Sequence, residues 1–322
     1  MRVRTGLPTL LVLFLVASIP AGAQAQGWPN HPLKAVIPLS AGSAADVVPR
    51  IVFEQVSAKL GQPIVIENRT GASGTIGARA VAEAEPDGYT LLAHSSAHIL
   101  APSTVANLSY DPVKDFVAIA PLGNLPSVLV VAPSKNIRTV QDLVALGKQR
   151  AITFGVIGVG SPIYLTMERF RLSAGFQGQP IPFRGAPEAL TEVMTGRVDV
   201  YYSPVLAALP FIRSGQLLPL AVSSSKRTSI LPDVPTTLEA GYPDSEYNFW
   251  IGVFAPAKTP PAIVGRLNRD ISNVLRDPAV REKLAKLGVE PMEMTADEFN
   301  AFVRKELVLN ANLAKAAGIS PR

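Results

Sequence analysis

Short β-rich runs alternate with amphipathic helical segments along most of this chain, and this alternation restricts the possible folds more than any other feature. A β-rich run from Leu33 to Pro38 precedes a helical segment, Val47 to Leu60, which Gly61 is placed to end. Because repeated strand, helix, strand units build parallel sheets with crossover helices, the pattern predicts an α/β fold. Further strand candidates are Pro63 to Glu67, Tyr89 to Ala93, Ser127 to Ala132, Ala151 to Val156 and Val198 to Tyr202.

The last third of the sequence is mainly helical. Apolar residues recur at helical spacing after Pro260-Pro261, and Asp277-Pro278 opens a second helix. Thr295 and Glu298 have the spacing of a capping box at the start of a third helix. We expect these helices to pack on the first of two lobes.

The N-terminus has the layout of a secretory signal peptide. Arg2 and Arg4 precede an apolar run from about Leu7 to Ile19, and Ala23-Gln24-Ala25 follows. The apolar run is about a dozen residues, whereas a membrane-spanning helix needs roughly 20. We therefore expect residues 1–25 to be removed near Ala25, and the exported remainder to be soluble, without direct insertion into a membrane.

Composition excludes several classes of function. The formal net charge is +5, and the basic residues are scattered among acidic ones, so nothing indicates nucleic-acid binding. Cysteine is absent, which excludes a disulfide framework, a thiol nucleophile and a lipid-modified N-terminal cysteine. We expect a monomer without a cofactor.

The length of 322 residues is sufficient for two domains. Because the sequence has no flexible Gly/Ser linker, ordered segments must join the lobes, and Val117 to Val130 and Tyr247 to Pro256 are the expected crossings. We assign residues 26–123 and 253–322 to the first lobe and residues 124–252 to the second.

Two loops of small residues are candidate anion sites. Pro38 to Asp46 joins the first strand to the first helix, and Gly155 to Pro162 has the same position after a strand in the second lobe. Free amides at a helix N-terminus attract anions, and small side chains let a ligand approach the backbone. Either loop alone could be an ordinary turn, but a pair in different lobes is what a cleft needs to hold one anion from both sides.

Two enzymatic or metal-binding interpretations are weaker. His94 and His98 are four residues apart, but no third metal ligand accompanies them. Ser95, Ser96 or Ser161 could serve a serine hydrolase with Asp46 or Asp87 as the acid, yet none lies in a nucleophile elbow. We therefore expect no metal and no catalysis.

Four stretches of the sequence are specific enough to compare with a known family: Glu67-Asn68-Arg69-Thr70-Gly71-Ala72-Ser73-Gly74-Thr75-Ile76-Gly77, Pro86-Asp87-Gly88-Tyr89-Thr90-Leu91, Tyr110-Asp111-Pro112 and Leu231-Pro232-Asp233-Val234-Pro235-Thr236. Together these motifs resemble those of the Bug-type solute receptors of tripartite tricarboxylate transport systems. The resemblance extends from Trp28-Pro29 to about Ala317. It implies a periplasmic protein of the type II-like periplasmic-binding-protein class, with two Rossmann-like lobes, a carboxylate in the cleft and delivery to membrane subunits.

The resemblance also implies a set of ligand-binding residues. The first lobe would supply Leu39, Ala41, Gly42, Ser43, Asp46, Ser95 and Ser96. The second lobe would supply Gly160, Ser161, Arg184, Gly185, Ala186 and Ser203.

The sequence departs from the family pattern at a few positions within or near this set. Gly42-Ser43 replaces a Gly-Gly pair, Leu39 an aromatic residue, and Tyr164 a histidine. Ser203-Pro204 replaces a position that is more often acidic, which favours a plain carboxylate over an amino acid. The leading hypothesis is a receptor for a small mono- or dicarboxylate, which could be aromatic; a secreted serine hydrolase and a sensor or scaffold without a transport role are the alternatives.

Overall fold

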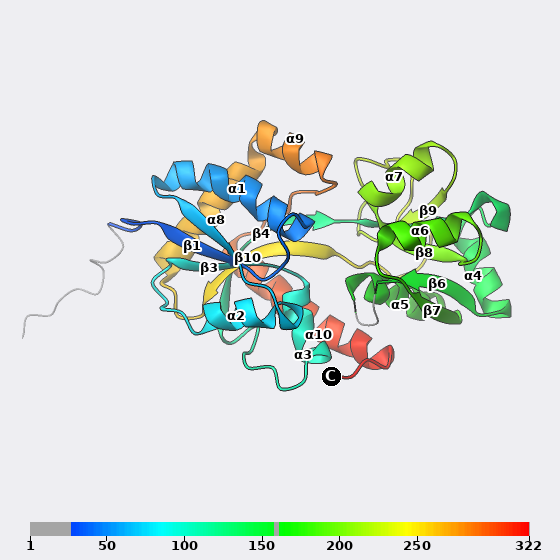
Figure 1. Ribbon diagram of the computed structural model, residues 1–322, viewed down its shortest axis with the longest axis horizontal. Coiled ribbons are helices and arrows are strands. Elements are labelled where there is room, and N and C mark those ends of the chain that lie inside the picture. Colours follow the sequence, from blue (N-terminus) through cyan, green and yellow to red (C-terminus); the bar gives the residue numbers. More distant parts are fainter. Residues whose placement is uncertain (1–26, 158–160, 322) are drawn as a thin grey trace, which may run out of the picture.

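The computed structural model describes residues 27–157 and 161–321, which form two α/β lobes beside one another (Figure 1). The first lobe has a sheet of order β2-β1-β3-β10-β4, and the second a sheet of order β7-β6-β8-β5-β9. The strands are β1 (Leu33–Ile37), β2 (Ile64–Asn68), β3 (Thr90–Ser95), β4 (Phe116–Leu125), β5 (Ser127–Val131), β6 (Ile152–Val156), β7 (Gly178–Pro182), β8 (Val200–Pro204), β9 (Leu218–Val222) and β10 (Phe249–Pro256). The helices are α1 (Ala44–Leu60), α2 (Thr75–Ala82), α3 (Ala97–Thr104), α4 (Val140–Gln149), α5 (Pro162–Ala174), α6 (Ala186–Met194), α7 (Val205–Arg213), α8 (Pro261–Arg276), α9 (Pro278–Lys286) and α10 (Ala296–Ala316). The predicted α/β class with two lobes is confirmed.

The predicted parallel pairing is correct for three neighbouring strands in each sheet. β1 runs parallel to β2 and β3, and β6 runs parallel to β7 and β8. The expectation of wholly parallel sheets is wrong at β10 and β5, which run antiparallel to both of their neighbours. These two strands enter their sheets from the other lobe, without the crossover helix that a parallel connection requires.

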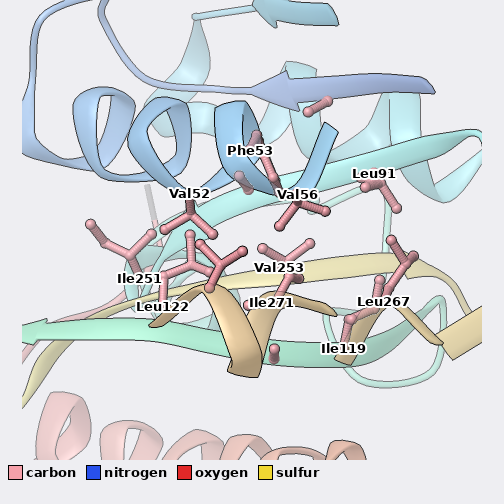
Figure 2. Close-up of a cluster of buried hydrophobic side chains, with 14 of the residues drawn as sticks. Val52, Phe53, Val56, Leu91, Ile119, Leu122, Ile251, Val253, Leu267 and Ile271 are labelled. Atoms are coloured by element: carbon pink, nitrogen blue, oxygen red, sulfur yellow. The ribbon is translucent and has the colours of Figure 1, made fainter. Parts of the chain in front are cut away.

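In the first lobe, helices cover both faces of the sheet (Figure 1). α1 and α8 bury one apolar cluster against β3, β4 and β10, in which Val52 and Phe53 of α1 point toward Ile251 and Val253 (Figure 2). A second cluster, on the other face, joins α2 and α10 to the sheet through Val81 and residues of α10. Burial on both faces holds the strand ends at fixed positions.

The second lobe has the same three-layer arrangement. α4 and α5 contribute Leu143 and Phe170 to a cluster on one face of its sheet. α6 and α7 contribute Leu190 and Val205 to a cluster on the opposite face. Each lobe therefore has its own hydrophobic core.

The two predicted crossings lie side by side. β4 passes into β5 at Pro126, and the second segment returns through Tyr247 to β10. The Tyr247 amide donates to the Ser223 carbonyl at 2.8 Å, and the Ser223 amide donates to the Ser127 carbonyl at 2.8 Å. These backbone bonds tie the crossing segments together where the chain leaves one sheet for the other.

The C-terminal helices pack on the first lobe as expected, except at the end of α10. Phe299 and Val303 of α10 lie in a first-lobe cluster, but Leu313 lies in a second-lobe cluster. The predicted signal peptide, residues 1–25, lies outside the described residues. Among the residues that are described, no helix has the length and apolar character needed to cross a membrane.

Candidate ligand-binding site

The loops that follow β1, β2 and β3 meet at one edge of the first sheet. Parallel strands end at the same edge, so residues 39–43, the residues after Asn68, and Ser95-Ser96 are brought together. Contacts around Gly74 confirm this proximity, because a Cβ there would lie 2.8 Å from His94 Nε2 and 3.5 Å from Pro38 Cβ. The predicted first-lobe residues therefore share one edge, on the side of the lobe that faces the second lobe (Figure 1).

The second lobe places its predicted residues in the same way. Val156 of β6 pairs with Pro182 of β7, and Gly155 of β6 pairs with Tyr201 of β8. The three parallel strands therefore end together, and the predicted residues follow these ends or lie close to them. They are Ser161, Arg184, Gly185, Ala186 and Ser203, while Gly160 lies outside the described residues.

The Leu39–Ser43 loop has an exposed tip, and its first residue packs against the core of the first lobe. Leu39 packs against the first-lobe core, whereas Ala41 and Gly42 are exposed. Gly42 has φ +82°, a left-handed conformation that favours glycine, and a Cβ there would meet no atom within 4 Å. Gly42 is thus required by backbone conformation rather than by lack of space. Ser43 is the N-cap residue of α1, and its side chain makes no capping bond.

The carboxylate of Asp46 is directed into its own lobe. Asp46 is only 2% exposed and accepts hydrogen bonds from the Gly42 amide at 2.8 Å and from Arg50 Nε at 3.0 Å. Burial acts to raise the pKa of Asp46, but the bonds from Arg50, Asn68 and Gly42 outweigh it and hold the pKa below its ordinary value. Asp46 is therefore a carboxylate compensated by its neighbours.

The Ser161 hydroxyl caps a helix and still has a proton to donate. Its Oγ accepts the Tyr164 amide at 3.2 Å and so caps α5. A hydroxyl that accepts one bond can still donate its own proton, so capping does not prevent a bond to a ligand carboxylate. Tyr164, which replaces the family's histidine, is 6% exposed and belongs to the second-lobe core.

The other predicted residues divide into buried and exposed positions. Ser95 and Ser96 are each 2% exposed, and Ser203 is fully buried with its Oγ donating to the Pro204 carbonyl at 3.1 Å. Arg184 is exposed, and its amide donates to Glu188 Oε2 at 3.0 Å. Arg184 therefore presents a cationic side chain near the second-lobe edge.

The histidine pair is part of an aromatic cluster. The ring of His98 lies 4.7 Å from that of Phe116 and 5.7 Å from that of Tyr110, measured between centroids. Burial lowers the pKa of His98 to about 3, and burial together with His98 lowers the pKa of His94. Both rings are neutral at neutral pH. No group of three or more His, Asp or Glu side chains in the described ranges could hold a metal ion.

The residues weighed for a serine hydrolase do not form a triad. The Nδ1 atom of His94 accepts the Ser95 amide at 2.8 Å, and Asp46 is paired with Arg50. Asp87 accepts the Tyr89 amide at 3.0 Å in a local turn. A triad requires a histidine bonded to both the nucleophile and the acid, and these side chains are engaged elsewhere.

Comparison with known proteins identifies the family of this chain. The family described as "Tripartite tricarboxylate transporter family receptor" matches residues 48–319. The chain belongs to this receptor family. Protein BugT of Bordetella pertussis is 34% identical over 311 residues, which cover 95% of each chain.

Solved structures of relatives agree with the fold. The R. palustris protein Rpa4515, solved with adipate, has a TM-score of 0.75 and 32% identity over 92% of this chain and 100% of its own. MatC from Rhodopseudomonas palustris, solved with bound malate, has a TM-score of 0.70 and 30% identity over 89% of this chain and 100% of its own. The receptor is therefore a solute-binding protein of the Bug type, in a periplasmic family.

Sequence reasoning missed the residues that support the first-lobe loop. Arg50 and Asn68 both contact the Asp46 carboxylate, and His94 occupies the space that a side chain at Gly74 would need. The i,i+4 spacing of Asp46 and Arg50 was a usable signal, since such pairs are neighbours on a helix. The contribution of Asn68 depends on the pairing of β1 with β2, which no local pattern specifies.

Proposed function

We propose that this receptor closes its two lobes around a small mono- or dicarboxylate and delivers it to the membrane subunits of a tripartite tricarboxylate transporter. The observation that carries the proposal is the position of the predicted residues. Those that the structure describes lie at or close to parallel strand ends in two separate sheets, and two adjacent crossings join these sheets. Such edges are where open α/β sheets bind ligands.

The chemistry of the two edges favours an anion. Arg184 is an exposed cation at the second edge, and Asp46, the acidic residue of the first loop, is compensated by Arg50. Ser203 and Pro204 place no carboxylate where a ligand ammonium would need one. Adipate and malate in two relatives support the same chemical class for this chain.

A thermal-shift experiment tests the proposal. Adipate, L-malate and an aromatic monocarboxylate are added to the mature protein, with adipamide as an uncharged counterpart of adipate. A ligand at one hundred times its Kd stabilises a protein by about 2.7 kcal/mol. At least one carboxylate should raise the Tm while adipamide does not. Equal shifts with adipate and adipamide, or no shift with any carboxylate across a broad screen, would contradict the proposal.

Small-angle scattering tests the closure. A ligand held from both sides stabilises the closed form, so the radius of gyration should fall at saturating ligand. A bound carboxylate that leaves the radius of gyration unchanged would indicate a rigid pocket instead.

A further inference from the structure

The carboxylate of Asp46 accepts hydrogen bonds from three residues in three different segments of the first lobe. Its oxygens accept from the Gly42 amide at 2.8 Å, from Asn68 Nδ2 at 2.8 Å, and from Arg50 Nε at 3.0 Å. These donors come from the loop, from the end of β2 and from the next turn of α1. All of them belong to the first lobe, and the side chain is almost fully buried.

Asn68 extends this network to the other end of the loop. Its Nδ2 also donates to the Leu39 carbonyl at 3.1 Å, and its Oδ1 accepts from Arg50 Nη2 at 2.7 Å. The network therefore holds the loop at Leu39 and again at Gly42. Between these two points lies the exposed tip at Ala41.

The network also determines which groups can meet a ligand. The Gly42 amide points at Asp46, so it is not directed at a ligand. An uncompensated carboxylate beside a bound carboxylate would repel it, because like charges in a poorly solvated site interact strongly. Arg50 removes this repulsion by pairing with Asp46, Nη2–Oδ1 2.9 Å.

We infer that Asp46 is a positioning residue: it holds the Leu39–Ser43 loop, with Gly42 in its left-handed conformation, in the shape that receives the ligand, and it does not itself touch the ligand. The loop-fixing role stands on the hydrogen bonds alone, whereas the effect on binding rests on the proposed function. Arg50 and Asn68 act with Asp46 as parts of the same network.

Amide hydrogen exchange of the ligand-free mature protein tests the loop-fixing role. Asp46→Asn removes the charge that holds Arg50 and the Gly42 amide. Loss of a charged hydrogen bond, about 1.5–3 kcal/mol, corresponds to roughly tenfold to hundredfold faster exchange at Gly42. Asn68→Ala, which retains Asp46, should also accelerate exchange across residues 39–43 and serves as a second variant if Asp46→Asn folds poorly.

Asp142→Asn is the matched control for exchange. Asp142 also accepts backbone amides, from Arg138 at 3.0 Å and Thr139 at 2.9 Å, but it lies in the second lobe. It should leave exchange at residues 39–43 unchanged. Unchanged exchange at Gly42 in both Asp46→Asn and Asn68→Ala would overturn the inference.

Calorimetry with adipate and L-malate separates positioning from direct contact. If Asp46 positions the loop, Asp46→Asn and Asn68→Ala weaken a given probe to a similar extent and both accelerate exchange at Gly42. Weaker binding by Asp46→Asn with normal exchange at Gly42 would show direct contact and overturn the inference. If the parent protein binds neither probe, the proposed function fails for these two ligands. The loop-fixing role is still decided, because the exchange experiment uses the ligand-free protein.

Discussion

The hydroxyl of Tyr164 in α5 donates a hydrogen bond to the carbonyl of Ala317 just after α10, with an Oη–O distance of 3.4 Å. These residues are 153 positions apart, and the helix that ends at Ala316 begins in the first lobe. Leu313 and Ile319 pack on the second-lobe core beside this bond. α10 therefore connects the lobes at a third place, in addition to the two crossing segments.

Shortening Leu313 should loosen this third connection. Leu313 is 8% exposed, and Leu→Ala in a core costs about 2–5 kcal/mol. We expect Leu313→Ala to lower the free energy of unfolding by about 2 kcal/mol and to increase the radius of gyration of the ligand-free protein. Denaturant unfolding and small-angle scattering measure both.

Val308→Ala is the control for this prediction. Val308 lies on the same helix but is 58% exposed, so its truncation should change the free energy of unfolding by less than about 0.5 kcal/mol. A radius of gyration that stays the same in Leu313→Ala would show that α10 does not restrain the lobes.

The sequence predicts elements better than it predicts how they combine. The helix ending at Gly61 was predicted correctly because glycine at that position adopts φ +69°. The segment of β10 was expected to cross between the lobes, but its antiparallel direction was not predicted, because direction depends on which strands of the first sheet it pairs with. The attachment of α10 to Tyr164 was missed for the same reason: its apolar spacing indicates a buried face but not which lobe buries it.

The candidate site shows the same division. The loops of small residues after strands indicated where backbone groups are accessible to a ligand. In each lobe, parallel pairing places the ends of the strands that precede such loops at one edge of the sheet. Which groups face a ligand depends on side-chain hydrogen bonds between distant segments. The bond from Asn68 to Asp46 spans 22 residues and two elements, so no sequence spacing could reveal it.

Asp199 should be the most important carboxylate for the stability of the second lobe. Its oxygens accept from Lys135 Nζ at 2.9 Å, from Arg150 at 2.7 and 2.8 Å, and from the Thr153 amide at 3.0 Å. Asp199 is buried but its cationic partners are partly exposed, so the main loss in Asp199→Asn is that of charged hydrogen bonds, and the free energy of unfolding should fall by about 2 kcal/mol. Denaturant unfolding at pH 7 measures this loss.

The pH dependence gives a second test of Asp199. Burial would raise its pKa, but hydrogen bonds from Arg150, Lys135 and Thr153 outweigh it and hold the pKa well below its ordinary value. The stabilisation is present above the unfolded pKa of about 3.9 and is lost as the pH falls from there through the folded pKa. Asp199→Asn should therefore lose less stability on acidification than the parent. Asp233→Asn, at an exposed position of the same lobe, is the control and should retain the parent's loss of stability on acidification.

Glu306 of α10 should have the opposite effect on stability. Burial raises its pKa; Arg169 of α5 opposes this, Glu246 adds to it, and Lys305 opposes it weakly. Because the folded pKa lies above the unfolded value of about 4.3, the protonated form favours folding. Its stabilising effect is complete below that value and is lost as the pH rises through the folded pKa. Glu306→Gln should therefore be more stable than the parent at pH 8.

Unfolding measured from pH 4 to pH 8 tests this prediction. The parent should lose stability as the pH rises through the folded pKa of Glu306, and Glu306→Gln should lose less. Glu54→Gln, on the exposed side of α1, should follow the parent at every pH. Parallel curves for Glu306→Gln and the parent would show that Glu306 does not titrate differently in the folded protein.

The last prediction separates the two roles of Ser161. Ser161→Ala removes the cap of α5, and Thr139→Ala removes the cap of α4, in which Thr139 Oγ1 accepts the Asp142 amide at 3.0 Å. Each should lower the free energy of unfolding by about 1 kcal/mol. Only Ser161→Ala also removes a hydroxyl from the candidate site, so it alone should weaken carboxylate binding, by roughly tenfold to hundredfold. Calorimetry that finds equal affinities in both variants would place the carboxylate away from Ser161.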